Sequence, residues 1–173
     1  MSQLPIAYAR IRKLASELIA GQTAPPVSLE PVISHVGAEL RCLDVADDIS
    51  GILIREGERK LIVVNEKHSV VRQRFTIAHE IAHLVLHRGE EVHVDSAFLV
   101  NLRDPRSGNA DNLEEVEANA FAANLLMPAD WVRRALRDTW VDVNDDSEVA
   151  RLSGLFQVSP QALLIRLTTL LRR

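Results

Sequence analysis

The sequence predicts an α+β fold in which a small antiparallel sheet of three strands packs on a bundle of helices. Apolar residues recur at helical spacing over most of the chain, whereas short β-branched segments separated by turn residues occupy the stretch from Glu39 to Asn65. The chain has 173 residues, 47% of them hydrophobic, which suffices for one sizeable core but is short for two ordinary domains. We therefore expect a single domain that covers residues 1–173.

The N-terminal part is predicted to be helical. Apolar positions from Ile6 to Ile19 form one helical stripe, and Gly21 follows as a stop signal. Pro25-Pro26 breaks the chain, after which Ser28 can cap a second, short helix from Leu29 to Val36. Both helices are expected to face the core.

The next segment is predicted to supply the three strands of the sheet. They are expected at residues 40–45, 51–55 and 60–65, and the last reads KLIVVN, rich in the β-branched residues that favour strands. The sequence EGER at residues 56–59 forms the turn between the second and third strands. A further strand-like stretch, VHVDSAFLV, begins at Val92, and residues 101–112 are typical of a mobile loop.

Helices are predicted over most of the remaining chain. One runs from Val70 to His87, and another, from Leu113 to Met127, is dense in Glu and Ala and is stopped by Pro128. A third is expected at residues 129–138. The region 148–173 divides into two helices near Val158-Ser159-Pro160, so that residues 146–173 form a C-terminal helical pair that closes the core.

The composition limits the partners and the compartment. The chain has 20 Lys and Arg and 24 Asp and Glu, and this net charge of -4 argues against binding of nucleic acid through a broad basic surface. The single cysteine, Cys42, has no partner for an internal disulfide and is expected in the core. The start MSQLPIAYARIRK lacks the apolar centre of a signal peptide, and no apolar run approaches about 18 residues. We expect a soluble, cytoplasmic protein that does not engage a membrane.

One stretch carries a pattern typical of metal chemistry. Residues 72–87 read RQRFTIAHEIAHLVLH and contain an H-E-x-x-H motif formed by His79, Glu80 and His83. On a helix, the i, i+4 spacing puts His79 and His83 on one face, so both imidazoles reach one small cation. Glu80 lies roughly 100° further round the helix, where it can hold a water on that cation and act as a general base. The two histidines supply half of a tetrahedral zinc site.

A catalytic zinc takes three protein ligands, so one more is required. The completion H-E-x-x-H-x-x-G-x-x-H is excluded, because the chain has Leu86 where glycine is needed and Gly89 where histidine is needed. His87 continues the helical row, but about 12 Å of helix separates it from His79, too far for one ion to bind all three histidines. We expect His87 at the solvated surface, with support of a ligand as the less favoured alternative.

The helix at residues 113–127 offers Glu114, Glu115 and Glu117 as the third ligand. Glu115 lies on the side of the apolar stripe of this helix and is our preferred ligand. Glu114 borders the stripe and Glu117 points further away, and both stay open as replacements. Asn119, four residues after Glu115, can hydrogen-bond the second ring nitrogen of a ligating histidine.

The blocks RQRFTIAHEIAHLVLH and EVEANAFAANLLMP resemble the signature of the ImmA/IrrE family of bacterial metallopeptidases, which is similar to the thermolysin-like gluzincins. The resemblance extends more weakly to KLIVVN and to FQVSPQALLIRL, and so covers most of the chain. It implies a minimal zincin-like fold with one catalytic zinc ion, for which manganese is an alternative. Carried over by position, the metal ligands are His79, His83 and Glu115, and the catalytic base is Glu80.

The resemblance also implies a function. Members of this family typically cleave or inactivate a helix-turn-helix repressor, so we expect a cytoplasmic protein substrate and a role in a stress response or a mobile-element switch. A zinc ion would lower the pKa of water and polarise the peptide carbonyl. The residue that stabilises the oxyanion stays open among Tyr8, His87, His93 and Arg106. Residues 90–111 are a candidate edge for gripping an extended substrate.

Two functions without catalysis stay open. Residues 148–171 show the succession of helix, short turn and helix that is typical of a helix-turn-helix motif. Arg166, Arg172 and Arg173 could contact phosphates, although these basic residues are few for a DNA-binding protein. A zinc-bound regulator that binds a partner without cutting it is the other alternative. The sequence defines neither the identity of the substrate nor the oligomeric state.

Overall fold

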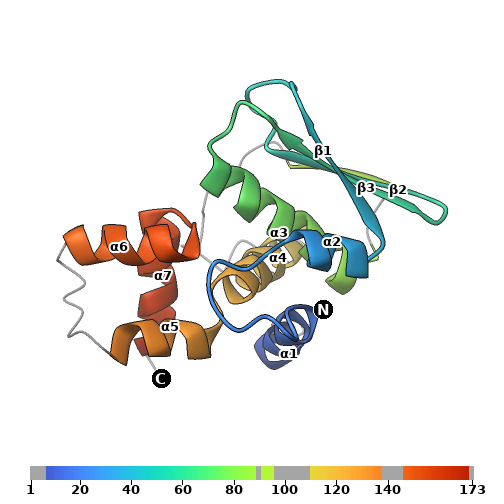
Figure 1. Cartoon of the computed structure of the whole chain (residues 1–173). Coiled ribbons are helices and arrows are strands. Elements are labelled where there is room, and N and C mark those ends of the chain that lie inside the picture. Colours follow the sequence, from blue (N-terminus) through green and yellow to red (C-terminus); the bar gives the residue numbers. More distant parts are fainter. Residues whose placement is uncertain (1–6, 89–90, 96–109, 138–145, 172–173) are drawn as a thin grey trace.

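The computed structural model describes residues 7–88, 91–95, 110–137 and 146–171. The architecture is α+β, as predicted. A four-stranded sheet lies on one side of helix α3 (Val70–Leu86), and helices α4 (Ala110–Leu126) and α1 (Tyr8–Leu18) lie on the other (Figure 1). The helix α3, which carries the H-E-x-x-H motif, therefore occupies the centre of the molecule.

The sheet is mixed and has the order β1-β3-β2-β4. The strands β2 (Gly51–Glu56) and β3 (Arg59–Asn65) form an antiparallel hairpin, and β4 (Val92–Asp95) pairs antiparallel with β2. The strand β1 (Ala38–Leu43) pairs with β3 in parallel. The expectation of three antiparallel strands is thus wrong in two respects: β1 is parallel to its neighbour, and there is a fourth strand.

The burial of β3 explains this order. It carries a continuous buried run from Ile62 to Asn65, whereas β1 is largely exposed. A strand with such a buried run is expected inside a sheet, in agreement with the position of β3 between β1 and β2. Because β1 is an edge strand, Cys42 is exposed, and the expectation that it lies in the core is wrong.

Small residues form the contact between α3 and α4. Ala78 and Ala82 on α3, and Ala118 and Ala122 on α4, are all fully buried in the hydrophobic core. Small side chains allow two helices to approach closely. This approach brings the polar side chains that flank the alanines on both helices within hydrogen-bonding distance of one another.

The remaining helices cover the two ends of α4. The short helix α2 (Glu30–His35) lies next to β1, and helices α5 (Ala129–Arg137), α6 (Asp146–Phe156) and α7 (Pro160–Leu171) gather at the C-terminal end of α4 (Figure 1). Of the loop expected at residues 101–112, residues 110–112 belong to α4, and the others lie outside the described ranges. The extent of the domain remains a prediction.

Arg166 ties α7 to the end of α4. Its side chain is 4% exposed, donates from Nε to the carbonyl oxygen of Met127 at 3.0 Å, and donates from Nη2 to Oδ1 of Asn124 at 2.8 Å. Arg166 is therefore a packing residue, and the suggestion that it touches phosphates is wrong. Arg172 and Arg173 lie outside the described residues. Within the described ranges, no helix has the length and apolarity needed to cross a membrane.

Candidate metal centre

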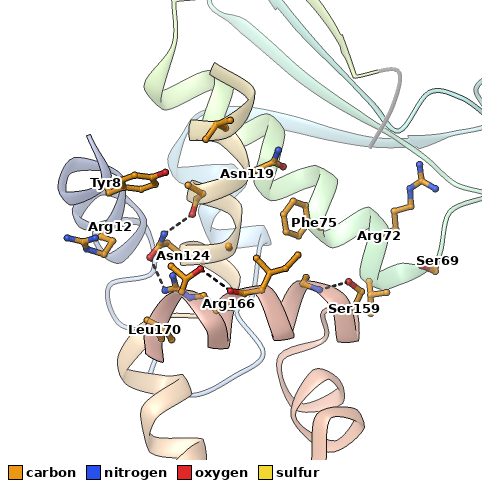
Figure 2. Close-up of a pocket in the computed structure, with 17 residues that line it drawn as sticks. Tyr8, Arg12, Ser69, Arg72, Phe75, Asn119, Asn124, Ser159, Arg166 and Leu170 are labelled. Atoms are coloured by element: carbon orange, nitrogen blue, oxygen red, sulfur yellow. Dashed lines mark hydrogen bonds between the residues drawn. The ribbon is translucent and has the colours of Figure 1, made fainter. Parts of the chain in front are cut away.

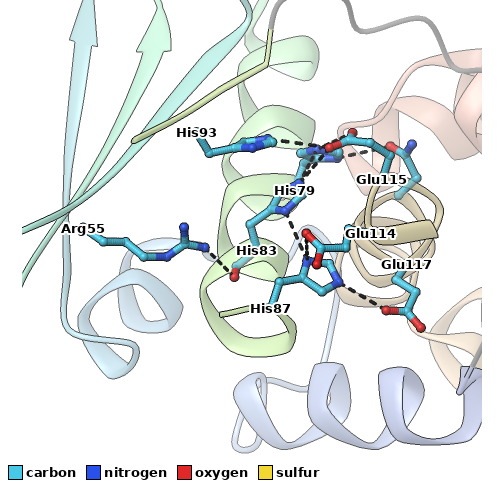
Figure 3. Close-up of polar contacts among 9 residues, drawn as sticks. Arg55, His79, His83, His87, His93, Glu114, Glu115 and Glu117 are labelled. Atoms are coloured by element: carbon cyan, nitrogen blue, oxygen red, sulfur yellow. Dashed lines mark hydrogen bonds and ion pairs between the residues drawn. The ribbon is translucent and has the colours of Figure 1, made fainter. Parts of the chain in front are cut away.

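Helix α3 buries its motif completely. His79, Glu80 and His83 are 1%, 0% and 2% exposed, so all three side chains are directed into the protein. The helix begins after Ser69, as predicted, and Arg55 of β2 donates from Nη2 to the carbonyl oxygen of His83 at 2.7 Å. The sheet and α4 thus enclose the two histidines from opposite sides (Figure 3).

Glu115 of α4 joins the two histidines. Its Oε2 lies 3.2 Å from Nε2 of His79, its Oε1 lies 3.2 Å from Nε2 of His83, and the two Nε2 atoms are 3.0 Å apart (Figure 3). Ligands about 2.1 Å from a tetrahedral zinc ion would be about 3.4 Å from one another. The two nitrogens and the carboxylate therefore fit a zinc ion with small shifts. That these residues bind a metal remains a prediction.

The two alternative glutamates face His87 instead. Oε2 of Glu117 lies 3.2 Å from Nε2 of His87, and Oε2 of Glu114 lies 4.0 Å from its Nδ1. Among the three glutamates, Glu115 is the one that contacts both histidines of the motif.

The charge states of His83 and Glu115 suit metal binding, whereas the acidic groups around His79 raise the pKa of its imidazole against the effect of burial. Burial lowers the pKa of His83 to about 4, although its hydrogen bond with Glu115 acts in the opposite direction. Burial would raise the pKa of Glu115, but the hydrogen bonds from His79 and His83 outweigh it and hold that pKa below its usual range. A metal requires a neutral imidazole and an ionised carboxylate, which are the forms that these shifts favour at neutral pH for His83 and Glu115.

Asn119 and His87 hold the second ring nitrogens of the two histidines. Nδ1 of His79 lies 3.2 Å from Oδ1 of Asn119, and Nδ1 of His83 lies 3.2 Å from Nδ1 of His87. If Nε2 of each ring binds a metal, its Nδ1 must carry the proton and donate it. His87 then accepts at Nδ1 and donates from Nε2 to Glu117, 3.2 Å away.

The side chain of His87 is 5% exposed, so the expectation that it lies at the solvated surface is wrong. Glu114 and Glu117 of α4 lie against its ring and cover the C-terminal end of α3. The less favoured alternative, support of a ligand, is the arrangement that its contact with His83 provides.

Glu80 is the least satisfied polar group of the site. Its carboxylate is fully buried, and neither oxygen has a hydrogen-bond partner among the described residues. Burial raises the pKa of Glu80 to about 8, with His79 opposing this shift and Asp95 and Glu115 adding to it. Gly51 makes room for the carboxylate, since a Cβ atom there would lie 2.7 Å from Oε1 of Glu80.

His93 of β4, one of the four residues that the sequence left open for stabilising the oxyanion, lies beside the motif. Its Nε2 lies 3.6 Å from Oε1 of Glu115, and its ring centroid lies 4.2 Å from that of His83. His93 and Asp95 alternate with exposed Val92 and Val94, so both polar residues face α3. This period of two within VHVD is the signal that could have identified the pair.

The other candidates for the oxyanion lie elsewhere. Tyr8 lines a cavity of about 470 Å³ between α1, α3, α4 and α7, on whose wall Asn119 and Phe75 also lie (Figure 2). His87 contacts His83 rather than the space between the ligands. Arg106 lies outside the described residues.

Comparisons with known proteins give the family of the chain. A peptidase family model described as the IrrE N-terminal-like domain matches residues 36–168. The radiation response metalloprotease IrrE of Deinococcus deserti is 40% identical over 78 residues, which are 43% of this chain and 25% of that protein. The uncharacterized immunity region protein 2 of Bacillus phage phi105 is 27% identical over 149 residues, 86% of this chain and 85% of that protein. The chain thus spans about a quarter of the first relative and most of the second.

Proposed function

The chain belongs to the IrrE N-terminal-like family of peptidases, and from this premise we propose that it is a zinc-dependent peptidase that cleaves a cytoplasmic helix-turn-helix repressor. In this proposal His79, His83 and Glu115 hold the zinc ion, with manganese as the alternative, and Glu80 is the general base. The observation that carries it is the carboxylate of Glu115, which lies 3.2 Å from Nε2 of both histidines.

The chemistry follows from the groups around this cluster. A bound zinc ion supplies the Lewis acidity that activates water and polarises a peptide carbonyl. Glu80 accepts the proton that water loses as its oxygen bonds to the carbonyl carbon, and it delivers a proton to the leaving nitrogen as the C–N bond breaks. A carboxylate with a raised pKa and no hydrogen-bond partner among the described residues suits a group that must take and release a proton.

Two observations support a protein substrate. The outer edge of β4 pairs with no other strand of the described sheet, so an extended peptide can add there by main-chain hydrogen bonds. The similarity to an immunity region protein of a phage supports a repressor as that substrate and a mobile-element switch as the setting. The similarity to a radiation response metalloprotease supports a stress response as the alternative setting.

The test is incubation of the purified protein with the helix-turn-helix protein encoded beside it, with and without a chelator. We expect a discrete fragment that disappears with the chelator and returns with added zinc. Glu80→Gln should reduce cleavage about 10²- to 10⁴-fold while the bound zinc is retained. Glu58→Gln, a change of the same kind at an exposed turn, is the matched control and should cleave normally.

A regulator that binds zinc without cutting predicts a different pattern. Glu80→Gln would then keep the full biological effect, whereas His79→Ala would lose it. That result, together with no fragment from the wild-type protein, would show that the metal is structural or regulatory and would refute the peptidase.

A further inference from the structure

His93 packs against the ring of His83 and directs its Nε2 toward the carboxylate of Glu115. Its Nε2 is buried without a hydrogen-bond partner among the described residues, and its distance of 3.6 Å from Oε1 of Glu115 exceeds that of a hydrogen bond. The ligand atoms of His79, His83, Glu115 and His93 all lie within 4.8 Å of one another. The ring of His93 is directed from the sheet toward the carboxylate of Glu115 (Figure 3).

Four of these atom pairs have nearly the spacing expected for ligands of one ion. The atom pairs among His79, His83 and Glu115 are 3.0 to 3.2 Å apart, and the pair formed by Glu115 and His93 is 3.6 Å apart. In a tetrahedral zinc site such pairs are about 3.4 Å apart.

The backbone of β4 fixes where this ring points. His93 pairs with Leu53 of β2, and the backbone hydrogen bonds Arg55 N to Glu91 O, at 2.6 Å, and Ser50 N to Asp95 O, at 2.9 Å, secure both ends of the strand. The inner edge of β4 is therefore held by β2, whereas the outer edge is available to an added strand.

We propose that His93 is a fourth protein ligand, which closes the metal position in the resting protein and leaves it when a substrate strand pairs with β4. A site with four protein ligands has no open position for water or a carbonyl, as in structural zinc sites. Departure of His93 converts it into the three-ligand site of a catalytic zinc. This inference rests on the proposed function, because it assumes that His79, His83 and Glu115 bind the ion.

The deciding measurement is the visible spectrum of the protein loaded with cobalt(II) in place of zinc. We expect the intense bands of a four-coordinate site in the wild-type protein, and weaker, shifted bands in His93→Ala, where solvent oxygen replaces a nitrogen ligand. Zinc affinity, measured by competition with a chromophoric chelator, should fall about tenfold or more in His93→Ala. Hydrolysis of a short unstructured peptide should rise, since its access no longer requires displacement of the ring.

Val94→Ala is the matched control, because Val94 is the next residue of the same strand and faces outward with 45% exposure. It should leave the cobalt spectrum and the zinc affinity unchanged. His93→Gln, which keeps a polar side chain of similar size, replaces His93→Ala if that variant does not fold.

The outcomes separate three cases. An unchanged spectrum and affinity in the His93 variants would show that His93 is not a ligand. A changed spectrum with reduced peptide hydrolysis would overturn its closing role and make His93 a group required for turnover. Failure of the wild-type protein to bind cobalt or zinc at all would instead refute the proposed function on which the inference rests.

Discussion

The two walls of the candidate site differ in how their polar atoms are satisfied. The helical wall, formed by residues 115–119 of α4, contacts the histidines of α3 at 3.2 Å through Glu115 and Asn119. The sheet wall, formed by Gly51 of β2 and His93 of β4, encloses three polar atoms without hydrogen-bond partners among the described residues: both carboxylate oxygens of Glu80, and Nε2 of His93. One wall therefore fixes the ligands, and the other holds groups whose partners arrive with the metal or the substrate.

Secondary structure explains the difference. His79 and His83 are four residues apart on α3, and Glu115 and Asn119 are four residues apart on α4, so the two rows have the same spacing along their helices. A strand presents only every second residue to one face, about 7 Å apart, and β4 is four residues long. The sheet wall thus offers few side chains, and the carboxylate of Glu80 is buried against it without a hydrogen-bond partner among the described residues.

The largest expected effect concerns the buried acid of the sheet wall in the metal-free protein. Glu80 has a pKa of about 8 in the fold and about 4.5 as a free group. Between these values the unfolded chain loses the proton that the folded chain keeps, so stability falls as the pH rises from about 4.5 to 8 and is unaffected below. Glu80→Gln should therefore stabilise the metal-free protein at pH 8 by roughly a few kcal/mol and have little effect at pH 4.5.

Denaturant unfolding of both metal-free proteins across this pH range is the measurement. If the free energy of unfolding varies with pH in the same way for the wild type and Glu80→Gln, Glu80 is ionised in the folded protein. The sheet wall would then not differ from the helical wall in leaving a buried acid unsatisfied. The same experiment with saturating zinc should reduce the difference, because a nearby cation favours the charged carboxylate.

The next effect concerns the space that Gly51 provides. In Gly51→Ala the new Cβ would lie 2.6 Å from Cγ2 of Thr76 and 2.7 Å from Oε1 of Glu80, so the motif helix or its carboxylate must shift. We expect a loss of about 1–3 kcal/mol in the free energy of unfolding and slower hydrolysis. Zinc affinity should change little, because the atoms that the new Cβ would meet belong to Thr76 and Glu80 and not to a proposed metal ligand.

Gly154→Ala is the control for this variant. Gly154 lies in α6, and a Cβ there would have no heavy atom within 4 Å. Alanine in an open helical position should stabilise the protein by about 0.5–1 kcal/mol. If Gly51→Ala proves as well tolerated as Gly154→Ala, the close approach of β2 to Glu80 is unimportant.

The sequence predicted the helical wall better than the sheet wall. The spacing of His79 and His83, and the side of the helix on which Glu115 and Asn119 lie, follow from the 3.6-residue period of two helices, and the structure brings all four together. The order of strands in a sheet cannot be predicted from the periodicity of apolar residues along the chain. The central place of β3 and the fourth strand β4 depend on burial, which is decided by the assembled fold.

The sequence misplaced His87 at the surface and left His93 as one of four candidates for the same reason. The exposure of His87 depends on how far α4 extends over the end of α3, and this extent is set by packing between alanines distant in the sequence. The position of His93 depends on the register of β4 against β2, which places it opposite Leu53. Neither relation can be obtained from local spacing, so the residue type alone made both histidines candidates for the oxyanion and could not decide between them.

The smallest expected effect concerns the supports of the ligand rings on the helical wall. Asn119→Ala removes the acceptor for Nδ1 of His79, and Glu117→Ala removes the acceptor for His87, which in turn contacts His83. Each should lower zinc affinity about tenfold, because the ring loses the hydrogen bond that fixes its tautomer. Chelator competition measures this, and Glu114→Ala, on the same helix but 4.0 Å from His87, should change the affinity less than about twofold. An equal loss in Glu117→Ala and Glu114→Ala would mean that the negative charge of α4, rather than the hydrogen bond through His87, supports the metal, and the helical wall would then act through its electrostatic field alone.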